Sequence, residues 1–251
     1  MKKFLSVLVL AMLCTGVTAF AQTTTYAVNS SSINNLLQIL SSSNAFTLAS
    51  SPSTAAPTYK PVILATTKTV EDLMYAVRGE MTANAKYLKF ADAADAEGYH
   101  GVAGVFRAIS DAELKHSQDE FAIAQRLNPD VVLPVTLNPY TVGTTRENLQ
   151  AAIDGETEEY TSMYVNFRAT ANTENQLDAR GIFTLAKLAE QVHAGIYADL
   201  LANLDNFDSA KYGVIYRCPT CGNIMLGDPK LIACPKCADG GGGFIQYTIT
   251  N

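Results

Sequence analysis

The sequence predicts an all-α main domain, a four-helix bundle, followed by a small metal-binding module of strands and loops. Three observations support this prediction. Four stretches between residues 69 and 207, each far longer than an average helix, are rich in Ala, Leu and Met. Glutamates interrupt their apolar patterns at repeating positions. Residues 208–251 carry two Cys-x-x-Cys pairs instead of helix signals.

The composition is typical of a globular protein and argues against binding to nucleic acid. Of the 251 residues, 48% are hydrophobic and 17% are charged, which is enough apolar material for a packed core. The net charge of −6 argues against the basic surface that nucleic acid requires. Because the chain has only three His, carboxylates must provide most of the ligands of any metal site in the bundle.

Residues 1–21 are predicted to form a signal peptide. Lys2 and Lys3 precede an apolar run that ends at Phe20, is too short to span a membrane, and closes with an Ala-x-Ala pattern. We therefore expect an exported protein, periplasmic or secreted, without a membrane span after cleavage. Lipid attachment at Cys14 and a retained N-terminal anchor are the alternatives. Residues 22–66, rich in Ser and Thr, are predicted to be a flexible tether.

Local signals mark the ends of the predicted helices. The four helices are residues 69–97, 100–127, 144–172 and 176–207. Capping-box patterns begin the first at Thr69 and the third at Thr144. Three prolines identify residues 128–143 as a long crossover loop between the two helix pairs. We assign residues 67–207 to the bundle and 208–251 to the C-terminal module.

Acidic residues lie in the middle of apolar helices, where an unpaired carboxylate is costly. Glu80 precedes the turn at Gly98 by nearly the same number of residues as Glu113 follows it. An antiparallel helix pair therefore brings both to nearly the same height. Glu156 and Glu190 flank the second turn in the same way. The repeat predicts that the four acids converge around positive charge.

The same helices carry further ligand candidates at a spacing of three residues. Two Glu-x-x-His motifs and one Glu-x-x-Glu motif each present two side chains on one helix face. The predicted ligands are Glu80, Glu113, His116, Glu156, Glu159, Glu190 and His193. This arrangement is that of ferritin-like bundles with two metal ions, and the oxygen-rich set favours iron or manganese over a lone zinc. The alternative is that these acids are solvated faces of amphipathic helices.

The tail is predicted to hold a second metal site. Cys218-x-x-Cys221 and Cys234-x-x-Cys237 are two knuckles joined by a short segment, and together they bring four thiolates around one iron or zinc ion. A structural zinc ribbon and a pair of disulfides, the latter in an oxidising compartment, are the alternatives. A module this small folds poorly alone, so metal binding is expected to drive its folding.

Taken together, these motifs resemble those of the rubrerythrins over roughly residues 67–250. The matching motifs are Gly79-Glu80 with Tyr87, Glu97-Gly98-Tyr99, Glu113-x-x-His116, Gly155-Glu156-x-x-Glu159-Tyr160, Met163-Tyr164, Glu190-x-x-His193 and the four cysteines. The resemblance implies a ferritin-like di-iron domain joined to a rubredoxin-like module with one four-cysteine iron. It also implies an oxidoreductase that protects against peroxide.

The resemblance assigns a role to each predicted ligand. Glu113 and Glu190 would bridge the two irons. Glu80 would be a terminal ligand of one iron, and Glu156 and His193 would bind the other.

The remaining positions would act beside these ligands. Glu159 and His116 match a pair of which one ligates the oxidised site and the other the reduced site. Tyr87 and Tyr164 match tyrosines that hydrogen-bond the ligands, and we take them as candidate catalytic residues. The alternative is that both tyrosines are ordinary core residues with a satisfied hydroxyl.

The implied reaction is the reduction of hydrogen peroxide to water, with electrons relayed from the four-cysteine iron to the di-iron site. The resemblance also implies a homodimer in which each module approaches the partner's di-iron site. The electron donor stays unknown. Two other functions are open: a protein that oxidises or sequesters ferrous iron and has a zinc ribbon, and a secreted binding module with a metal-free bundle.

Overall fold

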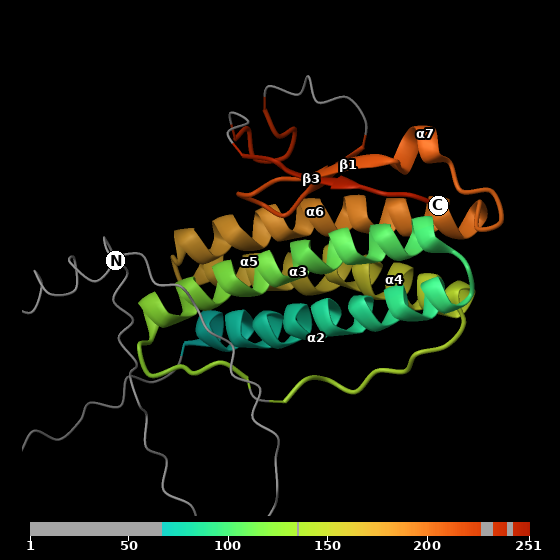
Figure 1. The fold of residues 1–251 in the computed structure, drawn as a ribbon. Coiled ribbons are helices and arrows are strands. Elements are labelled where there is room, and N and C mark those ends of the chain that lie inside the picture. The colour runs from blue at the N-terminus through green and yellow to red at the C-terminus, as the bar shows by residue number, and fades with distance from the viewer. Residues whose placement is uncertain (1–66, 135, 227–232, 240–242) are drawn as a thin grey trace, which may run out of the picture. The chain divides into compact units, whose positions relative to one another are not determined.

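The computed structural model describes residues 67–134, 136–226, 233–239 and 243–251. The predicted signal peptide and tether lie outside the described residues. The helices are α2 (Lys68–Ala96), α3 (His100–Leu127), α4 (Thr145–Glu158), the π-helical segment η1 (Glu159–Met163), α5 (Tyr164–Thr173) and α6 (Leu177–Ala202). Because α4, η1 and α5 follow one another without a break, they form one long helix, and the main domain is the predicted four-helix bundle (Figure 1).

Two predicted helix ends were wrong. The N-cap of α2 is Thr67, two residues before the predicted cap at Thr69: the Thr67 side chain accepts a hydrogen bond from the Val70 N–H, and Thr69 is buried within the first turn. Helix α6 ends at Ala202 rather than at residue 207. The Asn and Asp residues that follow it compete with the helix for backbone hydrogen bonds. The capping box at Thr144 is confirmed.

Both helix pairs turn through the same backbone motif. Gly98 adopts φ +88°, and the N–H of the next residue, Tyr99, donates to the Ala94 carbonyl at 2.8 Å. Asn175 adopts φ +55° and is followed by an equivalent bond of 2.7 Å. These are the bonds of a Schellman C-cap, which favours Gly or Asn at the left-handed position. The two halves of the bundle are therefore related in backbone as well as in sequence.

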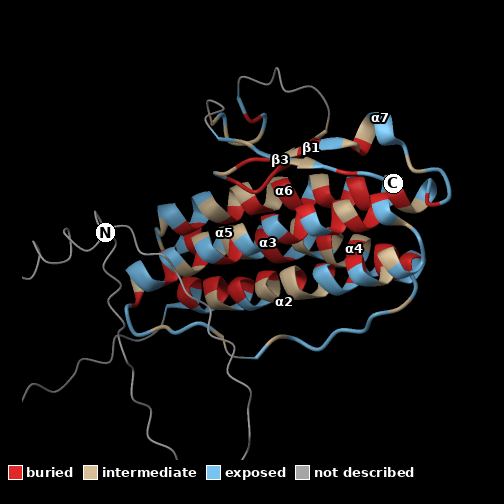
Figure 2. Ribbon diagram, in the orientation of Figure 1, coloured by how far each residue is buried: buried red, intermediate tan, exposed pale blue. Residues whose placement is uncertain are grey.

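Aromatic side chains pack the bundle interior. Tyr87, Phe90, Phe106 and Tyr197 form one group with ring centroids 5.0–6.0 Å apart. Such pairs contribute about 0.5–1.5 kcal/mol each beyond their buried area. Figure 2 shows buried residues along α2, α3 and α6 where these helices face one another. No helix in the described part of the chain is long and apolar enough to cross a membrane.

The C-terminal module consists of α7 (Ser209–Tyr212) and a three-stranded antiparallel sheet. The strands are β1 (Val214–Arg217), β2 (Ile224–Leu226) and β3 (Ile245–Thr248), in the order β2-β1-β3. Ile215, Ile224 and Ile249 are buried in the same hydrophobic cluster as side chains of α3 and α6. The module therefore completes its core against the bundle, and the two belong to one compact unit of the chain.

Candidate metal centres

Six of the seven predicted bundle ligands converge at one level. They form two overlapping groups, Glu80, Glu113, His116 and Glu190, and Glu113, Glu156, Glu190 and His193, and in each group the ligand atoms lie within 4.8 Å of one another. Two acids, Glu113 and Glu190, belong to both groups. All six side chains are at most 2% exposed, so the alternative of solvated helix faces is wrong.

The two histidines point into the acids from opposite halves of the bundle. Nδ1 of His116, on α3, lies 2.8 Å from Glu190 and 3.2 Å from Glu113. Nδ1 of His193, on α6, lies 2.7 Å from Glu190 and 3.1 Å from Glu113. Because i and i+3 share a helix face, each motif delivers its acid and its imidazole to the same point.

The cluster fits a pair of cations. Glu80, Glu113, Glu156 and Glu190 each have a buried carboxylate oxygen without a well-aligned hydrogen bond among the described residues. Both ring nitrogens of His193 lack one too, although its Nδ1 lies within ion-pair distance of the acids. Buried polar atoms are nearly always satisfied, so this many orphaned acceptors in one place indicate a ligand. Mixed carboxylate and imidazole donors suit iron or manganese.

Burial and mutual contact set the charge of this cluster. Burial raises the pKa of Glu80 to about 7 and the pKa of Glu156 to about 8. Burial also acts to raise the pKa of Glu113 and Glu190, but their contacts with the histidines bring the pKa of both below the ordinary value. Although burial disfavours imidazolium, the surrounding carboxylates raise the pKa of both histidines well above the ordinary value. When no metal is bound, two imidazolium rings therefore supply positive charge to the acids.

Each predicted tyrosine contacts an acid from the other half of the bundle. The Tyr87 hydroxyl donates to Glu156 at 2.5 Å, and the Tyr164 hydroxyl is in hydrogen-bond contact with Glu80. Both rings are buried. These contacts are those expected of tyrosines that orient ligands, and a core residue with a satisfied hydroxyl would make them too.

A one-residue slip in the repeat coincides with the π-helix. Tyr87 and Tyr164 are separated by one residue more than Glu80 and Glu156 are. The two Glu-x-x-His motifs are separated by the same larger number of residues. The extra residue therefore lies between Glu156 and Tyr164, where η1 widens the helix. Glu159 begins this segment. It is half-buried and does not belong to either group of converging ligand atoms.

One buried acid, Glu120, was missed by the sequence reasoning. It lies four residues after His116, is fully buried, and has one oxygen 2.7 Å from the Tyr164 hydroxyl. Burial raises the pKa of Glu120 well above the ordinary value. Its position on the Glu113 and His116 face of the helix was the signal that could have identified it.

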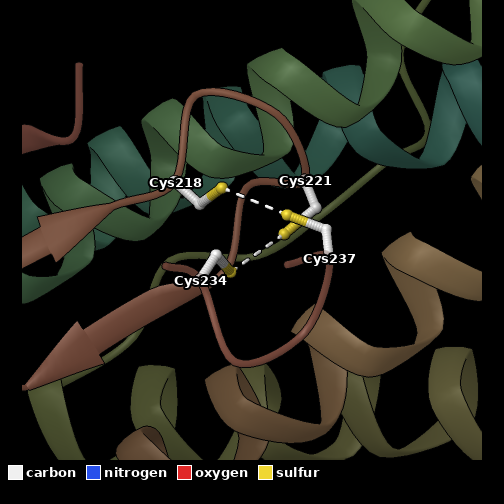
Figure 3. Close-up of side chains that lie close together, drawn as sticks. All are labelled: Cys218, Cys221, Cys234 and Cys237. Carbon is white, nitrogen blue, oxygen red and sulfur yellow. Dashed lines mark hydrogen bonds between the residues drawn. The ribbon is translucent and has the colours of Figure 1, made fainter. Parts of the chain in front are cut away.

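The four cysteines converge in the module, as Figure 3 shows. The Sγ atoms of Cys218 and Cys237 are 3.6 Å apart, and those of Cys221 and Cys234 are 3.7 Å apart. A disulfide would require about 2.05 Å, so the disulfide alternative is wrong. Four sulfurs at about 2.3 Å from a central ion would lie about 3.8 Å apart, which matches the observed separations.

The two cysteine knuckles have the same backbone. The N–H of Gly222 donates to the Cys218 carbonyl at 3.1 Å, and the N–H of Ala238 donates to the Cys234 carbonyl at 2.9 Å. Both donors have positive φ, +73° at Gly222 and +58° at Ala238. The two Cys-x-x-Cys pairs therefore lie on turns of the same type.

One histidine joins the two candidate metal centres. Nε2 of His116 lies 3.0 Å from the Cys221 carbonyl oxygen, while Nδ1 of the same ring faces the acids. The adjacent Gly222 makes this approach possible, because a Cβ there would overlap with Nε2 of His116. The contact is made within one chain.

Comparisons with known proteins agree with this geometry. Residues 71–201 match the sequence profile of the rubrerythrin family. Nigerythrin from Nitratidesulfovibrio vulgaris is 37% identical over 169 residues, which are 67% of this chain and 81% of that protein. A rubrerythrin from Porphyromonas gingivalis is 31% identical over 176 residues, which are 68% of this chain and 86% of that protein.

Solved structures of a related protein show the same fold. Nigerythrin in its fully reduced, all-ferrous state aligns with a TM-score of 0.66 and 33% identity, over 79% of this chain and 100% of that chain. A mixed-valent state of the same protein gives 0.65. Since the family profile covers more than half of the chain, the chain belongs to the rubrerythrin family.

Proposed function

We propose that this protein is a di-iron peroxide reductase whose electrons come from a rubredoxin-type iron in the four-cysteine site. The reaction consumes two protons and two electrons for each hydrogen peroxide and releases two waters. The observation that supports it best is the His116 imidazole, which contacts the acid cluster through Nδ1 and the Cys221 carbonyl through Nε2. A protein that only stored iron would not require this connection.

When bound, a pair of ferrous ions supplies two electrons and a Lewis-acidic site for the peroxide oxygens. Glu113 and Glu190, which are shared by both groups of ligand atoms, would bridge the pair. Glu80 would complete one ion's ligands, and Glu156 and His193 those of the other. The Tyr87 and Tyr164 hydroxyls would orient the two terminal acids.

Glu159 and His116 are proposed to exchange as ligands between the oxidised and reduced states. His116 belongs to one group of converging ligand atoms and Glu159 to neither, which supports His116 as the ligand of the reduced state and Glu159 as that of the oxidised state. Because Glu159 is half-buried while the other six are buried, it marks the side on which the cluster lies nearest to solvent. We propose that peroxide approaches from this side.

Peroxide oxidation of the reduced protein tests the function. Anaerobically reduced protein should be oxidised by one equivalent of hydrogen peroxide per di-iron site, and Glu80→Ala should slow this reaction at least about 100-fold. Glu158→Ala, an exposed acid on the same long helix as Glu156, is the matched control and should react as the unaltered protein does. Equal rates in all three proteins would contradict the proposal.

Metal analysis separates the proposal from its main competitor. We expect three irons per chain and the visible absorption of ferric thiolate from the tail. A colourless tail that contains zinc cannot relay electrons. That result would favour a ferritin-like protein that oxidises or sequesters iron and has a structural zinc ribbon.

A further inference from the structure

Glu120 is a buried carboxyl group for which the proposed reaction has no role. It projects from α3 on the face that carries Glu113 and His116, one turn beyond the imidazole. Its oxygen Oε1 lies 2.7 Å from the Tyr164 hydroxyl, and Oε2 is buried without a hydrogen-bond partner among the described residues. No Lys or Arg of the described chain forms a salt bridge with it.

A count of protons decides how this group is bonded. The Tyr164 hydroxyl contacts a carboxyl oxygen of Glu80 on one side and of Glu120 on the other. A phenol has one proton to donate, and an ionised carboxylate has none. Two ionised carboxylates would therefore leave one of the two contacts without a hydrogen. The chain of three oxygens needs one further proton.

The surroundings place that proton on Glu120. Glu80 lies in the cluster, with His116 Nδ1 3.7 Å from its other oxygen, and it must be ionised to hold a metal ion. Glu120 has neither an ion-pair partner nor a second hydrogen-bond donor among the described residues. A buried carboxyl without a counter-charge is stable only in its neutral form.

We propose that Glu120 is a positioning residue that, as a neutral acid, donates to the Tyr164 hydroxyl and so holds the hydroxyl's own proton on Glu80. The inference deepens the proposed function, on which it rests for the role of Glu80 as a ligand. The order of donors is then Glu120 to Tyr164 to Glu80, and each contact contains one hydrogen.

In the described residues, the side of the cluster that includes His193 has no second acid hydrogen-bonded to the tyrosine that contacts a ligand candidate. The residue four positions after His193 is Tyr197, where the first half has Glu120. Its ring packs against Tyr87 with centroids 5.3 Å apart, and its hydroxyl has no hydrogen-bond partner among the described residues. Tyr87 therefore donates to Glu156 without a second acid behind it. Tyr164, which is held between Glu80 and Glu120, lies on the side of the cluster that includes His116. His116 is the residue in contact with the four-cysteine module.

Infrared spectroscopy tests the protonation state directly. In protein loaded anaerobically with ferrous iron, the ligand acids are ionised, so a carbonyl band of a buried carboxylic acid that disappears on replacing Glu120 belongs to Glu120. A band from Glu159, which lies outside the converging ligand atoms, would persist in those variants. We expect this band in the unaltered protein and its loss in Glu120→Gln and Glu120→Leu. A spectrum of the unaltered protein without a band that Glu120→Gln removes would overturn the inference.

Rescue by the conservative variant tests the positioning role. The Gln amide can still donate to Tyr164, whereas Leu cannot. Competition with a chelator should show ferrous iron bound roughly three- to tenfold more weakly by Glu120→Leu, and within about twofold of normal by Glu120→Gln. In a Tyr164→Phe background neither substitution should change the affinity further. Equal losses in Gln and Leu, or additive losses with Tyr164→Phe, would contradict the role.

These measurements do not depend on turnover. A protein that shows the band and the rescue but does not react with peroxide would contradict the proposed function and support the inference about Glu120. A peroxide-active protein without the band would do the reverse.

Discussion

The imidazole of His116 contacts the carbonyl of Cys221, 105 residues later in the chain, at 3.0 Å. This contact joins the buried acid cluster of the bundle to the four-cysteine turn of the module. The rubrerythrin resemblance implied that such a module approaches the site of a partner chain. In this structure both groups belong to one chain.

Replacing Gly222 by Ala should break this contact. The added Cβ would overlap with His116 Nε2, and the residue has φ +73°, which disfavours a side chain. The module must then move away, and we expect reduction of the di-iron site by the four-cysteine iron to slow on the order of 100-fold. Stopped-flow absorbance would measure this rate. Peroxide oxidation of a fully reduced bundle should be unchanged, and a normal relay rate would count against the route.

Mixed oligomers should distinguish a relay within one chain from a relay between chains. One variant, Glu80→Ala, disables the bundle site, and a second, Cys218→Ser, disables the module. If each module serves its own bundle, a co-refolded mixture of the two should show no more steady-state peroxide turnover than the separate variants. Recovery of turnover in the mixture would show that the module serves a partner chain.

Metal binding to the bundle should release protons and should strengthen as pH rises. The pKa of both histidines is well above ordinary, and the pKa values of Glu80 and Glu156 are raised to about 7 and about 8, so these groups hold protons when no metal is bound. Ligands must lose those protons to bind a cation. At pH 7 we expect roughly two to four protons released per filled bundle site.

Calorimetry of ferrous iron binding in buffers of different ionisation enthalpy measures this release. The affinity should fall as pH drops from 8 to 6, since protons then compete with the metal. A His116→Gln/His193→Gln variant should release about two fewer protons. An affinity independent of pH would show that the cluster is not protonated in the metal-free state.

Deleting Ser162 should convert η1 into regular α-helix. Ser162 is exposed, and its deletion gives Glu156 and Tyr164 the same spacing that separates Glu80 from Tyr87 in the other half. The flanking helices should keep their packing, so thermal unfolding should change little, while Glu159 is reoriented and peroxide turnover falls. Ser162→Ala is the control and should preserve turnover. Normal turnover after the deletion would mean that the π-helix does not serve Glu159.

Ala238→Gly should stabilise the second cysteine knuckle. Ala238 adopts φ +58° at the position where the first knuckle has a glycine. A left-handed conformation costs a residue with a Cβ about 1 kcal/mol, and Gly avoids that cost. Thermal or denaturant unfolding of the metal-loaded protein should show a gain of about this size. A loss of stability would contradict the strain assigned to this turn.

The sequence by itself determined the four long helices, the capping box at Thr144 and the convergence of six of the seven predicted bundle ligands. These depend on local signals and on repeats, because a helix has a fixed rise and equal distances from a turn give equal heights. The cysteine spacing likewise predicts one tetrahedral site. The start of α2 and the end of α6 were predicted less well, since caps compete over one or two turns.

Only the tertiary structure decided how the parts act on one another. The sequence shows that equivalent residues of the two halves are not all separated by the same number of residues. The cause is the π-helix that begins at Glu159. Glu120 was invisible as a partner of Tyr164 because the two lie 44 residues apart on different helices. The contact between His116 and Cys221 depends on how the sheet packs against α3 and α6. Such contacts arise from packing between distant segments, which no local pattern records.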